Sequence, residues 1–327
     1  MADVICMGEL LAEFVAQKEN MSLEDAPGFV KAPGGAPANV AVALMRLGLS
    51  SAFVGKVGDD PFGRFLRRSL EADGVDTRFL MTDPRARTTA VYVTVWDDGH
   101  KDLCFYRNPG ADMLLRPDEI DTGMFAEARA FHFGSIGFID EPCASAQRKA
   151  LGLARRGGLM ISYDPNYRPT LWPSESQARK VIQDSFRYCH LAKVSQEEWE
   201  IASGHSDLEA GIQALLYQGV ELLVISRGES GSLAVTPDFR IELPAFPVEV
   251  VETTGAGDGF MAAMITRLLP VREKAGSLRR VDPETVRAAL NFANAVGALT
   301  CTRMGAIPAL PTLNEVNAFL VAQKEND

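Results

Sequence analysis

The stretch Glu252-Thr253-Thr254-Gly255-Ala256-Gly257-Asp258-Gly259-Phe260 combines a glycine-rich turn with the start of a helix, because apolar residues continue from it at helical spacing: Phe260, Met261, Met264, Ile265 and Leu268. Such a turn leaves backbone N–H groups unpaired at the positive end of the helix dipole, where they suit an anion. Asp258 would lie beside that anion despite the like charge. This favours a carboxylate that takes a proton from an attacking hydroxyl, with an ordinary helix-start aspartate as the alternative.

A second glycine-rich segment, Gly34-Gly35-Ala36-Pro37-Ala38-Asn39-Val40-Ala41, lies near the N-terminus. It is followed by Leu47-Gly48 and by Val54-Gly55-Lys56-Val57-Gly58-Asp59-Asp60. Glycine lets the backbone approach a ligand closely, and an asparagine in the first helical turn offers both a donor and an acceptor. The segment therefore suits an array of sugar hydroxyls, although a plain strand-to-helix turn would look the same.

Together, in this order, the two segments resemble the two signatures of the PfkB (ribokinase-like) carbohydrate kinases. The resemblance runs from Val4 to Pro311 and is greatest to the fructokinases and 2-keto-3-deoxygluconate kinases. It implies an ATP-dependent kinase in which Asp258 is the base and the N–H groups of Gly255, Ala256 and Gly257 stabilise the transferring phosphoryl group. It also implies ATP and Mg²⁺ as cofactors, and a single ribokinase-like domain over residues 1–327.

Short apolar segments alternate with amphipathic ones, which predicts an α/β fold with a mostly parallel sheet covered on both faces, a three-layer α/β/α sandwich. The expected strands are Val4–Met7, Ala52–Val57, Ala130–Phe133, Leu159–Tyr163, Leu191–Val194 and Glu221–Ser226. The expected helices include Pro37–Leu47, Pro61–Ala72, Glu175–Phe186, Leu208–Gln218, Ala256–Leu269 and Pro283–Thr302. Asp60 is expected to cap the second of these helices, with Pro61 at its first position.

One region departs from this alternation. Thr89–Trp96, Asp97-Asp98-Gly99-His100 and Asp102–Arg107 read as a β-hairpin with apolar side chains on both faces, so both faces are expected to be covered. A hairpin tucked into the core is one explanation, and a lid over the substrate is the other. The family resemblance implies a small β-sheet lid over about residues 12–33 and 88–110, which pairs with the lid of a second subunit in a homodimer.

Composition limits the partners. The 327 residues are 46% hydrophobic and 23% charged, which is ordinary for a globular protein, and the net charge of −10 argues against a nucleic-acid or anionic-membrane partner. No apolar run reaches the length of a membrane span. The five cysteines are scattered without metal-site or redox spacing, so we interpret them as core residues in a reducing compartment and expect a cytoplasmic protein with small-molecule substrates.

The resemblance also implies a sugar site. Its predicted members are Glu13, Gly34, Gly35, Asn39, Phe105, Arg107, Asn166, Arg168 and Asp258. The family usually has aspartate where this chain has Glu13. The run Asn108-Pro109-Gly110-Ala111-Asp112 favours fructose, whereas Glu13 favours another sugar, so 2-keto-3-deoxygluconate stays open as the substrate. Ribose, tagatose and nucleoside kinases, and an inactive nucleotide-binding homologue, are the remaining alternatives.

A nucleotide site is implied further along the chain. The expected ATP contacts are Lys193, Ser226, Arg227, Gly228, Gly231, Gly255, Gly257, Asn294 and Ala298. Glu198 would organise Mg²⁺ through water, although a solvated helix glutamate is the alternative. The chain has no Gly-x-x-x-x-Gly-Lys-Ser/Thr motif, which excludes a P-loop mechanism, and its second signature lacks dinucleotide-fold spacing.

The family's monovalent-cation site falls on Glu252, where aspartate is usual, together with Thr254. Ala298 and Gly305 are plausible neighbours of this site. We hypothesise on this basis that K⁺ activates the enzyme.

Overall fold

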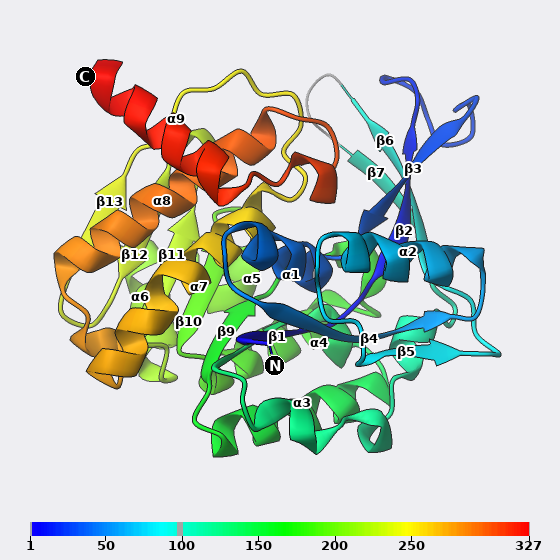
Figure 1. Ribbon diagram of the computed structural model, residues 1–327, viewed down its shortest axis with the longest axis horizontal. Helices are drawn as coiled ribbons and strands as arrows, with labels where there is room; N and C mark the ends of the chain where they lie inside the picture. Colours follow the sequence, from blue (N-terminus) through cyan, green and yellow to red (C-terminus); the bar gives the residue numbers. More distant parts are fainter. Residues whose placement is uncertain (1, 97–100, 327) are drawn as a thin grey trace.

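The computed structural model describes residues 2–96 and 101–326. Its centre is a nine-stranded sheet in the order β13-β12-β11-β10-β9-β8-β1-β4-β5 (Figure 1). The strands from β11 to β5 pair in parallel, and β12 and β13 add antiparallel neighbours at one edge. The bounds are β1 Val4–Met7, β4 Ser51–Gly58, β5 Leu80–Asp83, β8 Ala130–Gly134, β9 Met160–Asp164, β10 Leu191–Ser195, β11 Leu222–Ser226, β12 Ser232–Val235 and β13 Arg240–Leu243.

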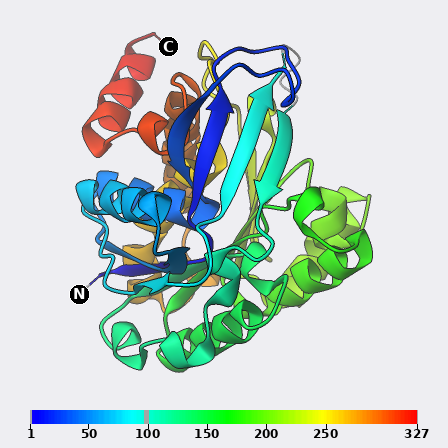
Figure 2. The same ribbon diagram turned by 90° about the vertical axis from the view of Figure 1, so that its right-hand side faces the viewer.

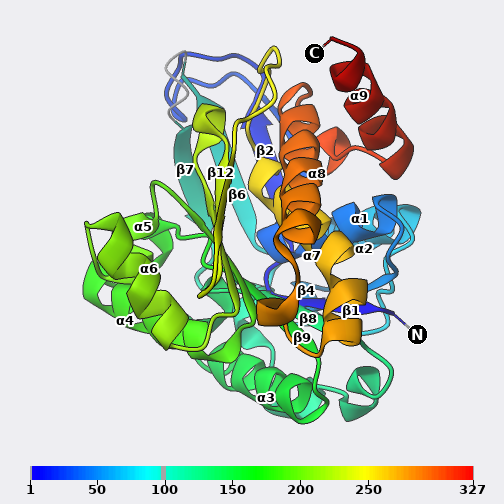
Figure 3. The same cartoon turned by 90° about the vertical axis from the view of Figure 1, so that its left-hand side faces the viewer.

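Helices cover both faces of this sheet, as the alternation of strands and helices predicted (Figure 3). One side carries α1 Ala36–Arg46, α2 Pro61–Ala72, α7 Ala256–Ala275, α8 Pro283–Cys301 and α9 Leu313–Asn326. The other side carries α3 Cys143–Arg156, α4 Glu175–Ser185, α5 Trp199–Ser203 and α6 Leu208–Tyr217. Strand β1 shows the reason: Val4 and Cys6 pack into the first layer, whereas Ile5 and Met7 pack into the second. The predicted α/β/α sandwich is confirmed.

Capping residues and prolines in the sequence predicted some helix ends correctly and others incorrectly. The Asp60 side chain accepts hydrogen bonds from the backbone N–H groups of Phe62 (3.0 Å) and Gly63 (2.8 Å), and α2 has the predicted bounds. Helix α7 continues beyond its predicted end, through Pro270 to Ala275, and stops at Gly276 in the left-handed conformation. Arg267 stacks on Phe292 of α8. This packing supports α7 close to Pro270, which has no backbone N–H to donate.

A second, four-stranded sheet stands apart from the body, in the order β3-β2-β6-β7 (Figure 2). It is built from β2 Leu11–Ala16, β3 Phe29–Gly34, β6 Ala90–Val95 and β7 Lys101–Tyr106. The β2–β3 and β6–β7 pairs are antiparallel, and β2 joins β6 in parallel. The two early segments and the hairpin strands thus form one sheet, while the predicted turn Asp97–His100 lies outside the described residues.

The two faces of the small sheet differ. One face buries Leu11, Val91 and Val93, with Phe105 packed against them. The opposite face carries a run of aromatic rings: Phe14 stacks on Tyr92, which makes edge contacts with Phe29 and Tyr106. Tyr106 is 66% exposed, so within this chain the second face is only partly covered.

No helix in the described part of the chain combines the length and apolar character that crossing a membrane requires.

Candidate active site

Helix α7 begins at a loop that only glycine fits. Gly255 precedes the helix with φ of 81°, and a Cβ built on it would lie 3.0 Å from Cα of Ala306. The side chain of Asp258 is in the first helical turn and is 9% exposed. The Asp258 carboxylate lies at this helix end, where the Ala256 N–H donates to the Thr253 carbonyl oxygen at 3.2 Å. The role of the loop N–H groups toward a phosphate stays a prediction.

The Asp258 carboxylate meets α1 across the site. Its Oδ2 accepts a hydrogen bond from Nδ2 of Asn39 at 2.8 Å. Burial raises the pKa of Asp258 to about 7, and the nearby Asp164 charge adds to this, while Asn39, Lys193 and Arg168 oppose it. A carboxylate with a pKa near neutrality is suited to accept a proton at physiological pH.

Asn39 keeps one bonding position open. It is 4% exposed, and its Oδ1 has no hydrogen-bond partner among the described residues. A buried acceptor without a partner costs free energy, which a hydroxyl donor from a ligand would recover. The first signature therefore supplies an unfilled acceptor next to Asp258.

Gly34 and Gly35 make room for the two early glutamates. A Cβ on Gly34 would come within 2.2 Å of Oε1 of Glu13, and one on Gly35 within 2.4 Å of the Glu9 carbonyl oxygen. Burial raises the pKa of Glu13 to about 7, with the charge of Glu252 adding to it and Lys101 and Arg168 opposing it. Glu9 instead accepts the Ala36 backbone N–H at 3.0 Å, so it holds the start of α1.

Arg107 is already paired. Its Nε and Nη2 both lie 2.7 Å from Oδ2 of Asp112, and Asp112 also accepts a hydrogen bond from the Thr89 hydroxyl. The sequence predicted that this guanidinium contacts the sugar, and its pairing with Asp112 was not predicted. Asp112 lies five residues away in the Asn108–Asp112 run, and opposite charges this close are the one signal that could have shown the pair.

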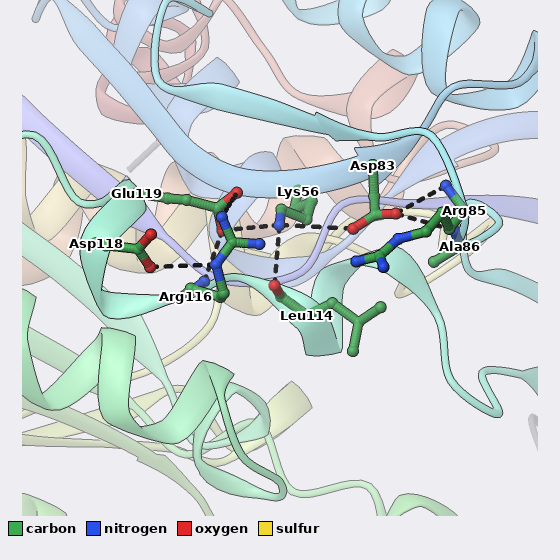
Figure 4. A network of polar contacts seen from close by, with 8 residues as sticks. All are labelled: Lys56, Asp83, Arg85, Ala86, Leu114, Arg116, Asp118 and Glu119. Carbon is green, nitrogen blue, oxygen red and sulfur yellow. Dashed lines mark hydrogen bonds and ion pairs between the residues drawn. The ribbon is translucent and has the colours of Figure 1, made fainter.

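A buried lysine fixes the segment that follows Arg107 (Figure 4). Lys56 of β4 is 1% exposed and donates to the carbonyl oxygen of Leu114 at 2.9 Å. Its ammonium also lies 2.7 Å from Glu119 and 3.7 Å from Asp83. These contacts connect β4 to the segment that carries Asp112, so they help to position the Arg107–Asp112 pair.

Asn166 and Arg168 follow β9 at its carboxyl end. Asn166 adopts a φ of 45°, uncommon for a residue with a side chain, and its N–H donates to Asp164 at 3.2 Å. The charge of Arg168 lowers the pKa of both Glu13 and Asp258 against their burial. Phe105 packs on the buried face of the small sheet. The roles of Glu13, Arg168 and Phe105 toward the sugar stay predictions.

Behind Asp258 lies a buried ionic group that sequence reasoning identified only in part. Lys193 of β10 is 2.8 Å from Asp164, and both side chains are nearly inaccessible. A Cβ built on Gly257 would lie 3.4 Å from Nζ of Lys193, so this ammonium sits directly against the glycine loop. Asp164 was not predicted; its place at the carboxyl end of a buried parallel strand was the available signal.

The Glu198 carboxylate joins the same group. It accepts backbone N–H groups from Tyr167 and, at 3.3 Å, from Ser195, and burial raises its pKa. It therefore links the loop after β9 to the turn after β10.

The predicted nucleotide turn follows β11. The Arg227 N–H donates to Gly231 O at 2.8 Å, while the guanidinium pairs with Glu242 at 2.5 Å. Gly228 and Gly231 both have positive φ, and a Cβ on Gly231 would strike the Leu243 carbonyl at 2.1 Å. The turn is thus a tight backbone loop at a strand end, where α/β sheets bind ligands. Ser226, which ends β11, is half-buried.

Helix α8 supplies the last two predicted nucleotide residues. Asn294 is bonded within the protein on both amide atoms: Oδ1 accepts from Ser232 at 2.7 Å and Nδ2 donates to Pro244 O at 3.0 Å. Ala298 is half-buried, one residue beyond Gly297, whose built Cβ would face the Ala256 carbonyl at 3.8 Å. Their roles toward ATP remain predictions.

The family model described as pfkB family carbohydrate kinase matches residues 1–313. This chain belongs to that family. The predicted resemblance is confirmed, and the protein is an ATP-dependent sugar kinase.

Relatives of this PfkB kinase cover nearly its whole length. Probable fructokinase-2 of Arabidopsis thaliana is 44% identical over 323 residues, 98% of this chain and 97% of the relative. The structure of a fructokinase from Xylella fastidiosa with bound ATP matches with a TM-score of 0.88 at 33% identity, covering 99% of this chain and all of that one. A Vibrio cholerae fructokinase double mutant bound to fructose, ADP and a potassium ion matches with a TM-score of 0.87 at 32% identity, covering 98% of both chains.

In this PfkB kinase the predicted monovalent-cation residues are already bonded. Glu252 accepts the Gly305 N–H on Oε2 at 2.6 Å, and its Oε1 lies 3.1 Å from the ammonium of Lys101 in β7. Lys101 also donates to the Thr254 hydroxyl. Sequence reasoning missed Lys101, because nothing local to β7 signals a partner that lies 151 residues away.

The described residues hold no cluster of three or more His, Cys, Asp or Glu side chains arranged to bind a metal ion.

Proposed function

We propose that this kinase transfers the terminal phosphoryl group of ATP to the primary hydroxyl of a ketose, converting fructose to fructose 6-phosphate. The observation that carries the proposal is the Asp258–Asn39 pair at the start of α7. It combines a carboxylate whose pKa is near 7 with an unfilled buried acceptor. Fructose is favoured because the relatives are fructokinases, one of them with fructose bound.

In the proposed mechanism the sugar hydroxyl gives its proton to Asp258, and its oxygen forms a bond to the terminal phosphorus of ATP. The bond from that phosphorus to the bridging oxygen breaks, and ADP leaves. The N–H groups of Gly255 and Gly257 stabilise the charge on the transferring group, with Lys193 against Gly257. The Ala256 N–H, which was predicted to join them, donates to the Thr253 carbonyl oxygen at 3.2 Å. The base would contribute roughly 10²–10⁴-fold to the rate, and positioning most of the remainder. Glu13, Asn39 and Arg168 orient the sugar hydroxyls.

Mg²⁺ is part of the proposal as the partner of ATP. The available donors are carboxylate oxygens, which suit this ion, and Glu198 would hold it through water. When bound to the phosphates, the ion would neutralise their negative charge. The turn after β11, with Ser226, Arg227, Gly228 and Gly231, and the α8 residue Ala298 would line the nucleotide.

K⁺ activation, which the family resemblance implies, is not part of the proposal. Both side chains of its predicted site, Glu252 and Thr254, are bonded to Lys101.

The four-stranded sheet is proposed as the lid of a single kinase domain over residues 1–327. Its buried face would close over the sugar and exclude water, which otherwise competes for the phosphoryl group. Its partly exposed aromatic face, with Tyr106, would pack on the lid of a second copy to form a homodimer. We place the enzyme in the cytoplasm, where ATP is available; its five cysteines are all free thiols.

The nearest competitor is 2-keto-3-deoxygluconate, whose carboxylate needs a cationic partner in the site. Asp112 already neutralises Arg107, which leaves Arg168 for that task. This observation favours the neutral ketose.

A sugar panel tests the proposal. Purified protein with ATP and Mg²⁺ is assayed for ADP release with fructose, 2-keto-3-deoxygluconate, ribose, tagatose and a nucleoside. Fructose should give the highest kcat/KM. A higher value with 2-keto-3-deoxygluconate would replace the substrate, and no release with any sugar, together with intact ATP binding, would indicate an inactive homologue.

A further inference from the structure

A lysine of the small sheet reaches the loop that leads into α7. Lys101 belongs to β7, which pairs only with β6 in that sheet, yet its ammonium bonds Glu252 and Thr254 of the body. The side chain of Glu252 is 8% exposed and that of Lys101 is 24% exposed. An ion pair this shielded is weakened little by salt.

These contacts use every side-chain oxygen of the predicted cation site. Glu252 Oε1 faces Lys101, Oε2 accepts the Gly305 N–H, and the Thr254 hydroxyl bonds both Lys101 and Glu252. A cation such as K⁺ needs several free oxygen ligands, and a second positive charge beside an ammonium is repelled. The residues present therefore do not fit a free K⁺ ion while Lys101 is in place.

We infer that the Lys101 ammonium takes the place of a monovalent cation in this kinase, as a positive charge tethered to the lid. Lys101 is a positioning residue: it neutralises Glu252 and orders the segment from Thr253 to Gly257, which leads into α7 and belongs to the proposed phosphate site. The inference rests on the proposed function and adds to it that the wild-type enzyme does not require K⁺.

The charges around Lys101 explain why its loss should matter. Besides burial, the charge of Glu252 raises the pKa of Glu13, while Lys101 and Arg168 lower it. Against its burial, the pKa of Glu252 is lowered by hydrogen bonds from Thr254 and Gly305 and by Lys101. Without Lys101, the shielded Glu252 carboxylate would lose this cationic partner, close to the proposed phosphate site. Its repulsion would weaken anion binding and loosen the loop.

The contact between Lys101 and Glu252 also links closure of the lid to the order of the glycine loop. Lys101 can bond Glu252 only while the sheet lies over the body, so the charge arrives when the lid is closed. A free ion would bind whether or not the sugar was covered. The lysine therefore ties the order of the glycine loop to enclosure of the substrate.

Kinetics give the first test. Wild type, Lys101→Met and Lys101→Arg are assayed with ATP and the best sugar in KCl and in N-methyl-D-glucamine chloride at equal ionic strength. Wild type and Lys101→Arg should be equally fast in both salts. Lys101→Met should lose about 10- to 100-fold in kcat/KM without K⁺ and recover part of it in KCl. Lys18→Met, which removes an exposed lysine beyond β2, should match wild type.

Thermal unfolding gives a test that needs no turnover. KCl should raise the melting temperature of Lys101→Met above its value in N-methyl-D-glucamine chloride, and should leave wild type unchanged. A wild type that needs K⁺, or a Lys101→Met variant that is fast and indifferent to K⁺ in both measurements, overturns the inference. If wild type phosphorylates no sugar, the proposed function fails, while the melting comparison still decides the role of Lys101.

Discussion

Asp258 and Arg107 were both predicted to touch the sugar, and both are buried, yet the protein uses their bonding capacity very differently. The Asp258 carboxylate accepts a hydrogen bond from Asn39, whose own Oδ1 has no partner among the described residues. Arg107 is bonded twice to Asp112, which a third residue, Thr89, also holds. The first corner of the site, Asp258 with Asn39, leaves a hydrogen-bond acceptor that a ligand can fill. In the second corner, Arg107 with Asp112, the charges are paired within the protein. Substitutions should therefore affect chemistry at the first corner and stability at the second.

The largest effect is expected for Asp258→Asn. An amide of the same shape cannot accept the hydroxyl proton, so kcat should fall by about 10²–10⁴-fold or more, with ATP binding retained. The melting temperature should stay equal or rise, because an ionised carboxylate is no longer buried. Steady-state kinetics, nucleotide titration and thermal unfolding measure these three quantities.

Glu9→Gln is the matched control for Asp258→Asn. Burial raises the pKa of Glu9 to about 7 as well, but its carboxylate serves the start of α1, and an amide oxygen can still accept the Ala36 N–H. This variant should change kcat far less. Equal losses of kcat in the two variants would show that Asp258 has no role beyond that of another buried carboxylate.

The next effect is expected in stability, for Asp112→Ala. It leaves the guanidinium of Arg107, which is 8% exposed, without its carboxylate, at a cost of about 3–5 kcal/mol in the free energy of unfolding. Denaturant titration measures the loss. The exposed Asp118→Ala should leave the transition unchanged. If Asp112→Ala is stable but has lost sugar affinity, Arg107 belongs with Asp258 as a ligand residue and the contrast between the corners fails.

A smaller loss is expected for Asn39→Ala, about 10- to 100-fold in kcat/KM for the sugar. The hydrogen bond from Asn39 lowers the pKa of Asp258, so its removal should raise that pKa further. Because the base must be ionised, the acidic limb of the pH–rate profile should move to higher pH. An unshifted limb would show that the limb does not report Asp258.

The smallest effect is expected for Glu242→Ala. Its partner Arg227 lies in the predicted nucleotide turn, but Glu242 is 64% exposed, so the pair should contribute at most about 1 kcal/mol to stability. Freeing the guanidinium should lower the KM for ATP modestly and leave kcat unchanged. Arg227→Ala is the matched variant and should raise that KM. Unchanged ATP kinetics in both variants would remove Arg227 from the nucleotide site.

Features carried by neighbouring residues were predictable from the sequence. The bounds of α2 followed from Asp60 and Pro61, and the glycine loop before Asp258 follows from local backbone preferences. Strands β5, β12 and β13 and helices α3, α5 and α9 were not among the expected elements. The continuation of α7 past Pro270 was missed as well, because packing against α8 outweighs the helix-breaking tendency of proline.

The order of most strands and helices, the two glycine-rich turns and the residue types at the site could be predicted from the sequence, since these depend on residues a few positions apart. Which charges are paired and which polar atoms stay without a partner depends on how the chain folds. Lys101 reaches Glu252 across 151 residues, and Asn39 reaches Asp258 across 219. Ion pairs and hydrogen bonds depend on distances of a few ångströms, and chain folding rather than sequence proximity sets those distances.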